Sequence, residues 1–162
     1  VDALPEIVSE EVVDLFSRYG VLDERELESR YEVYLEQYHM KVSVEARTTL
    51  EMARTIVLPA AIRYQGDLAS TAAAMVTAGL SADTALLEGI TESIAQLSAT
   101  IEVLYAAMQA APEVTGLESA THARDSVIPA MEAVRRTADE FESLVADDLW
   151  PLPTYQEMLT IL

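Results

Sequence analysis

The sequence predicts an all-α protein, an antiparallel bundle of four to six helices, and three observations support this. Apolar residues make up 51% of the 162 residues, and the helix formers Ala, Leu and Glu are abundant. Only five glycines and six prolines occur, too few for a turn-rich β protein. Between residues 87 and 108, apolar residues recur at alternating intervals of three and four, as in a heptad repeat. The length suits one domain, so we expect residues 1–162 to form a single helical domain.

The first helix is predicted over residues 10–19. Ser9 is a candidate N-cap, and Gly20 can adopt the left-handed conformation that ends a helix. Apolar side chains fall on one face of this helix, namely Val12, Leu15, Phe16 and Tyr19.

The second helix is predicted to open at residues 23–26, which read as a variant of the capping box. Its buried stripe is expected to contain Leu27, Tyr31, Tyr34, Leu35 and Tyr38. A break is expected at residues 39–43, because two valines interrupt good helix formers there and Ser43 could cap a new helix.

The next helical pattern runs from Val44 to about Ala78, where Gly79 should end it. Pro59 lies inside this run. A proline lacks the backbone donor and crowds the carbonyl four residues earlier, so we expect a kink or a break at this residue. Pro129 repeats the arrangement inside the last long helix, again after an aliphatic pair and before an alanine.

The clearest helix is predicted from a cap at Ser81 or Asp83 to about Ala111. Its heptad seam consists of Leu87, Ile90, Ile94, Leu97, Ile101, Leu104 and Met108. The expected partner is a helix over residues 117–149, with near-heptad spacing of Val127, Met131, Val134, Ala138, Phe141 and Val145. Because only residues 112–116 separate the two, they should pack antiparallel. Packing within the chain is the main interpretation, and an intermolecular coiled coil is the alternative.

The C-terminal segment contains the only tryptophan. Two prolines end the helix at Trp150-Pro151-Leu152-Pro153, and Thr154 could cap a short final helix. Trp150 and Tyr155 are our candidate site residues, as anchors of the tail on the bundle or as contacts to a neighbouring domain or subunit.

We find no catalytic, cofactor-binding or metal-binding constellation in the sequence. Glu36 and His39 have the Glu-x-x-His spacing of di-iron bundles, but such a site needs a second copy, and Ser119 stands at that offset from His122. The glycines are too far apart for a phosphate-binding loop, and no Gly-x-Ser-x-Gly elbow occurs. The polar residues 63–65 after Pro59 could line an interface, satisfy freed carbonyls or face solvent.

The net charge of −18 argues against nucleic acid and anionic membranes as partners. No apolar run is long enough to cross a bilayer. The absence of cysteine fits a cytoplasmic location, and the start at Val1 without methionine leads us to expect a piece of a longer protein. The acidic surface is either a docking face for a basic partner or a solvated surface.

Three segments resemble the C-terminal region of type III glutamine synthetases. They are YGVLDERELESRYEVYLEQY at residues 19–38, EMARTIVLPAAIRYQ at residues 51–65, and LWPLPTY at residues 149–155. Asp23 stands where the family pattern has serine, a change that keeps the capping role. The middle of the chain, from Ser81 to Asp139, adds little to the resemblance.

The resemblance implies a noncatalytic helical domain of an ATP-dependent glutamate–ammonia ligase. In that family the metal-binding glutamates and the nucleotide contacts, with ATP and Mg or Mn, belong to an upstream catalytic domain, and the subunits form ring-shaped homo-oligomers. None of those residues maps onto this chain, so the implied role is structural, with the catalytic domain and other subunits as partners. Two further hypotheses stay open, namely a free-standing acidic helical-bundle protein-binding module and a bundle metalloenzyme built on Glu36 and His39.

Overall fold

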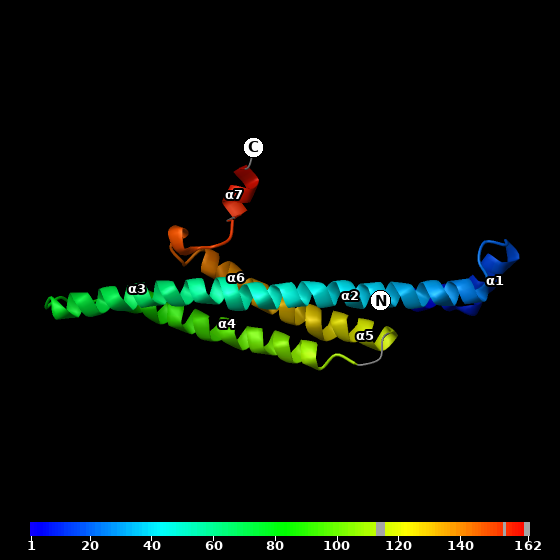
Figure 1. Cartoon of the computed structure of the whole chain (residues 1–162), viewed down its shortest axis with the longest axis horizontal. Coiled ribbons are helices and arrows are strands. Elements are labelled where there is room, and N and C mark those ends of the chain that lie inside the picture. The colour runs from blue at the N-terminus through cyan, green and yellow to red at the C-terminus, as the bar shows by residue number, and fades with distance from the viewer. Residues whose placement is uncertain (113–115, 154, 161–162) are drawn as a thin grey trace. The chain divides into compact units, whose positions relative to one another are not determined.

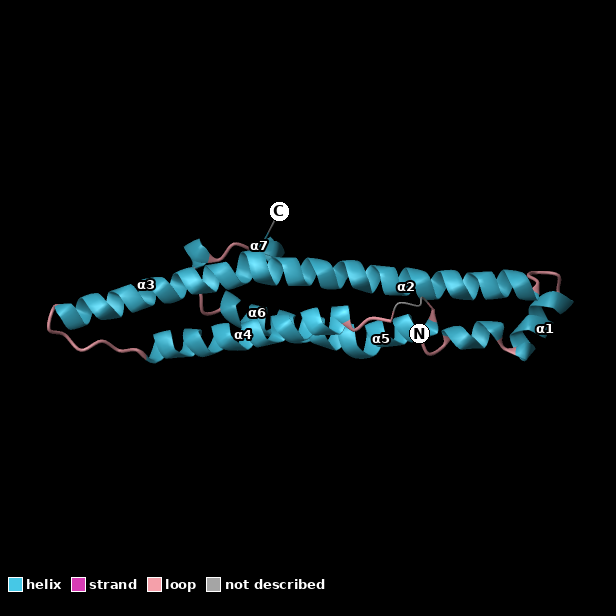
Figure 2. Ribbon diagram, turned by 60° about the horizontal axis from the view of Figure 1, so that its bottom comes forward, coloured by secondary structure: helices cyan, strands magenta, loops and turns pink. Residues whose placement is uncertain are grey.

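The computed structural model of the chain describes residues 1–112, 116–153 and 155–160, and every regular element in these ranges is a helix (Figures 1 and 2). The predicted all-α class is therefore confirmed. The residues gather in two compact units. Unit 1 comprises Val1–Arg47 and Ala106–Pro129, and unit 2 comprises Thr48–Tyr105 and Ala130–Leu162.

Unit 1 begins with a short 3-10 helix, η1 (Leu4–Val8), followed by α1 (Glu10–Arg18). Gly20 has a φ of 64°, the left-handed conformation predicted for the residue that ends α1. The Ser9 hydroxyl does not cap α1 as predicted. It donates instead to the Glu6 carbonyl at 2.8 Å, because η1, which Pro5 favours at its start, ends directly before it.

The capping box at the start of α2 (Glu24–Met52) is confirmed, and it is reciprocal. The Glu26 amide donates to the Asp23 carboxylate at 2.8 Å, and the Asp23 amide donates to the Glu26 carboxylate at 2.9 Å. Two amides that the helix itself leaves free are thus satisfied.

The break predicted at residues 39–43 was wrong, because α2 is unbroken from Glu24 to Met52. Leu27, Leu35, Val42 and Ala46 are all buried, so the apolar stripe continues through the supposed break. Burial of Val42 outweighs the modest helix propensity of a β-branched residue. The prediction that Tyr34 belongs to the buried stripe was also wrong, since its side chain is exposed.

The remainder of unit 1 contains α5 (Leu117–His122) and a π-helical turn, η3 (Ala123–Val127). Arg124 on this turn donates from Nε to Asp125 at 2.6 Å and also pairs with Asp2 near the chain start. The first of these bonds is the main reason that the pKa of Arg124 is raised and that of Asp125 is lowered. The pairs connect the N-terminal segment with the π turn.

Unit 2 contains a second π-helical turn, η2 (Ala53–Val57), followed by α3 (Leu58–Thr77). In both π turns the next amide bonds to the carbonyl five residues back: Leu58 to Ala53 and Ile128 to Ala123. A proline follows immediately each time. The wider turn gives the proline ring room, so the chain stays helical through Pro59 and Pro129 and neither proline breaks its helix. The kink at each proline stays a prediction.

Two side-chain pairs fix the register of α4 (Ala85–Gln109) in unit 2. Arg54 bonds to Glu102 at 2.9 Å and Gln65 donates to Thr91 at 2.8 Å. The residue number rises from Arg54 to Gln65 along one segment while that of the partner falls equally along α4, so α4 runs antiparallel to the segment containing η2 and α3 (Figure 2). Gln65, from the polar cluster at residues 63–65, therefore joins two helices. Asp83 accepts from the Ala85 amide at 3.0 Å, as predicted for a cap.

The heptad seam forms the core of unit 2. The buried residues of this core include Ile90, Leu97, Ile101 and Leu104 from α4. Val134 and Phe141 from α6 (Ile128–Glu142) are buried as well. The helix predicted to run to residue 149 ends earlier, at Glu142. A short 3-10 helix, η4 (Asp147–Leu149), follows, and α7 spans Tyr155–Thr160. The predicted cap Thr154 lies outside the described residues.

Candidate functional site

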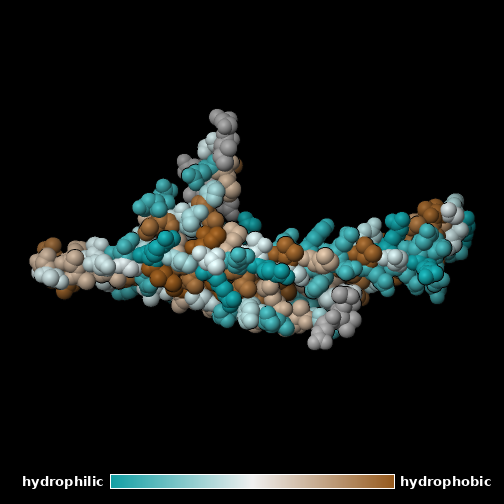
Figure 3. All heavy atoms as spheres, viewed as in Figure 1, coloured by the Kyte–Doolittle hydropathy of each residue, from teal (hydrophilic) through white to brown (hydrophobic). Residues whose placement is uncertain are grey.

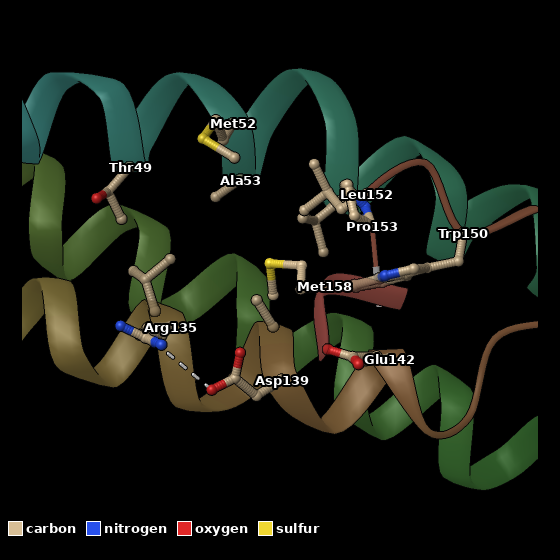
Figure 4. Close-up of a pocket in the computed structure, with 13 residues that line it drawn as sticks. Thr49, Met52, Ala53, Arg135, Asp139, Glu142, Trp150, Leu152, Pro153 and Met158 are labelled. Carbon is tan, nitrogen blue, oxygen red and sulfur yellow. Dashed lines mark ion pairs between the residues drawn. The ribbon is translucent and has the colours of Figure 1, made fainter. Parts of the chain in front are cut away.

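The C-terminal segment carries the candidate site residue Trp150. The 3-10 turn η4 places it, since the Trp150 amide bonds to the Ala146 carbonyl at 3.1 Å. The side chain is half-buried and lines a cavity of about 370 Å³ in unit 2. The cavity is also lined by Met52 from α2 (Figure 4), by Val57 from η2 and by Val134 from α6.

The indole donor of Trp150 has no hydrogen-bond acceptor among the described residues. Its Nε1 atom is buried, and no described residue accepts a hydrogen bond from it. A buried tryptophan N–H normally finds a partner, and a missing one costs stability. The ring lines the cavity together with Leu152 and Pro153 of the same segment, and its role as an anchor of the tail stays a prediction. The side chain of Tyr155, the other candidate, lies outside the described residues.

The rim of the same cavity is charged but has no catalytic arrangement. Arg135 and Asp139 form an ion pair one helical turn apart on α6, at 3.7 Å, and both side chains are largely exposed. Exposed pairs of this kind contribute little energy. The cavity thus combines an apolar lining with an exposed ion pair at its rim.

A second polar cluster ties η2 to α4. Arg54 bonds to Glu102, and its guanidinium carbon lies 4.8 Å from the centre of the Tyr105 ring. Sequence reasoning missed this cluster, because Arg54 is about fifty positions from Glu102 and Tyr105 and no local spacing pattern links them. Cation–π contact and the ion pair position the two helices relative to each other inside unit 2.

The Glu-x-x-His residues are not brought together as a metal site. Glu36 is exposed on α2, whereas His39 is half-buried with a buried Nδ1 atom. Within residues 1–112, 116–153 and 155–160, no three His, Cys, Asp or Glu side chains are grouped as metal ligands. None of the helices in these ranges combines the length and the hydrophobicity that crossing a bilayer requires.

The apolar face of α1 is partly exposed, since Val12 and Phe16 are half-buried whereas Leu15 is exposed. No residue of α1 is buried, although apolar side chains share one face of the helix. Leu15 is 48% exposed, Tyr19 is 74% exposed, and Val21 in the following turn is 60% exposed. Figure 3 shows apolar side chains at the surface near α1, among mostly hydrophilic neighbours. We call Leu15, Tyr19 and Val21 the α1 patch.

Comparison with known proteins gives the family. Residues 1–76 match the family model described as the glutamine synthetase C-terminal domain. The chain therefore carries a glutamine synthetase C-terminal domain. The matched range contains α1, the capping box and two of the three segments on which the sequence resemblance was based, so that resemblance is confirmed.

Individual relatives extend the match to almost the whole chain. A glutamine synthetase of Butyrivibrio fibrisolvens is 32% identical over 164 residues, covering 98% of this chain and 23% of that protein. A type-3 glutamine synthetase of Dictyostelium discoideum is 32% identical over 167 residues, with the same two coverages. A glutamine synthetase of Bacteroides fragilis is 30% identical over 148 residues, covering 86% of this chain and 20% of that protein. The chain thus spans about a quarter of the length of the curated relatives it matches.

Proposed function

We propose that the chain is the noncatalytic structural and oligomerisation region of a type III glutamine synthetase, an ATP-dependent glutamate–ammonia ligase. The observation that supports this best is the α1 patch. Leaving several large apolar side chains in water gives up the free energy that their burial would contribute, at about 25 cal/mol per Å². Large apolar side chains that gather at one exposed place on a surface are typical of an interface.

The occupant that we propose for the α1 patch is the rest of the ligase, either its catalytic domain or another subunit. The patch belongs to the range that matches the family model, and the relatives contain roughly four times as much chain as is present here. The patch is apolar although the chain has a net charge of −18. Apolar contact favours a permanent interface over the salt-sensitive docking expected of an acidic binding module.

We assign the chemistry to the rest of the ligase. In this proposal glutamate, ammonia, ATP and the Mg or Mn ions are bound by the catalytic domain, and the assembly works in the cytoplasm. The family resemblance supports this division. The isolated 162-residue chain should then show no glutamine formation and no ATP binding by calorimetry, and micromolar ATP binding would contradict the noncatalytic part of the proposal.

The interface is tested by a charge on the α1 patch. Leu15→Lys in the full-length ligase should weaken subunit or domain association, which sedimentation velocity measures as a loss of the assembled species. Ser17→Lys is the matched control, because it adds the same charge to an exposed polar position of the same helix. Assembly of the Leu15→Lys protein equal to that of wild type would refute the proposed interface.

A further inference from the structure

Unit 1 contains a cavity that the proposed function does not use. It measures about 380 Å³ and is walled by α2, by the C-terminal end of α4, by α5 and by the π turn η3. Its polar lining consists of His39, Ser43, Arg47, Gln109 and His122, and the remaining lining residues are apolar. The volume lies at the small end of the range of ligand pockets.

The charge of the cavity is opposite to that of the chain. Of 38 charged residues 28 are acidic, yet among the described residues no aspartate or glutamate lines the cavity, whereas both histidines and one arginine do. The cavity of unit 2 differs in this respect, since Asp139 and Glu142 line it. A pocket whose described lining carries an arginine and two histidines, in so acidic a chain, is electrostatically suited to an anion.

Two of the basic residues that line the cavity, His39 and Arg47, could bond to a ligand. His39 Nδ1 is buried, and no described residue bonds to it. Arg47 forms no ion pair with any carboxylate in the described ranges, unlike Arg54 and Arg124. His122 is held in place, because its Nε2 lies 2.9 Å from the Ala107 carbonyl, which can only accept and so fixes the proton on that nitrogen.

We propose that this cavity binds a small aliphatic carboxylate. The Arg47 guanidinium would pair with the carboxylate, because its fork of donors matches the two oxygens, and His39 would add a hydrogen bond. The apolar lining would hold a short hydrocarbon chain. A ligand with an ammonium group fits poorly, because none of the described side chains that line the cavity is acidic and could pair with it.

Glutarate and glutamate are matched probes for this proposal, because they share a carbon skeleton and only glutamate carries an ammonium group. The 162-residue chain contains two histidines, so its imidazole proton resonances report on this cavity alone. Titration with glutarate should shift both resonances in a saturable manner, and glutamate and inorganic phosphate should bind more weakly. Failure of glutarate to move either resonance would overturn the site, and equal binding of phosphate or of glutamate would overturn its assignment to aliphatic carboxylates.

The variant Arg47→Gln should weaken glutarate binding about tenfold or more, as expected for loss of a charge-assisted bond. Arg63→Gln is the control, because it removes the same charge from an exposed position of α3. Equal weakening by both variants would show non-specific attraction and contradict the site. The circular dichroism melting curve of each variant establishes that the fold is intact. The outcome is independent of the α1 interface, since it is measured on this chain alone.

Discussion

Substitution of Trp150 separates the two properties of its indole, apolar packing and an unsatisfied donor. A fully buried aromatic side chain buries about 150–250 Å². Trp150 is half-buried, so about 100 Å² is in contact, which at about 25 cal/mol per Å² corresponds to about 2.5 kcal/mol. Trp150→Ala should therefore lower the free energy of unfolding by about 2–3 kcal/mol.

Trp150→Phe should have a much smaller effect. The smaller ring loses part of the apolar contact, about 1 kcal/mol, but it also removes the buried Nε1–H that no described residue accepts. An unsatisfied buried donor costs about 1–3 kcal/mol, so the two changes nearly cancel. We expect the free energy of unfolding of Trp150→Phe to lie within about 1 kcal/mol of wild type.

Urea denaturation followed by far-ultraviolet circular dichroism measures both variants, since each loses the only tryptophan fluorophore. Leu159→Ala serves as the control, because this α7 side chain is exposed and its loss should change stability by less than about 0.5 kcal/mol. If Trp150→Phe were destabilised as much as Trp150→Ala, the indole N–H must make a hydrogen bond, and the reasoning would be refuted. If Trp150→Ala were neutral, the tail would not be anchored by this ring.

Three further predictions concern the helices. Leu97→Ala, in the fully buried heptad seam, should lower the free energy of unfolding by about 2–5 kcal/mol in urea denaturation, whereas Val103→Ala, on the exposed face of the same helix, should change it little. Asp23→Ala removes one half of the capping box and should cost about 1 kcal/mol in the same assay, and no loss at all would mean that the box does not stabilise α2. Hydrogen bonds from Arg124 hold the pKa of Asp125 below its usual 3.8, so this pair stabilises the fold above that pH and its contribution is lost as the pH falls through the lowered pKa. The urea midpoint of Asp125→Asn should therefore depend less on pH than that of wild type between about pH 5 and pH 1, and identical profiles would contradict the pair's role.

Local signals in the sequence predicted local structure well. The capping box at residues 23–26 was predictable because its two hydrogen bonds join side chains and amides three residues apart. The heptad seam was predictable because periodic burial needs no knowledge of the partner. The helix end at Gly20 follows from the conformational freedom of glycine at positive φ.

Tertiary contacts decided the features that the sequence did not predict. Propensity placed a break near Val42, but burial of that side chain keeps α2 continuous. The π turns before Pro59 and Pro129 were missed, because the sequence indicates where a helix must adjust and not how. The cavity that unites His39 and His122 joins residues 83 positions apart, which no motif reports.

Hydrogen exchange of the α1 amides tests the central claim most directly. The claim is that the α1 patch is covered in the full-length ligase and exposed in this chain alone. Mass spectrometry of peptides spanning residues 10–22 should show slower exchange in the assembled ligase than in the isolated 162-residue chain, with peptides from the seam of α4 as the internal reference. Equal exchange in the two proteins would contradict an interface at α1 and with it the proposed structural role.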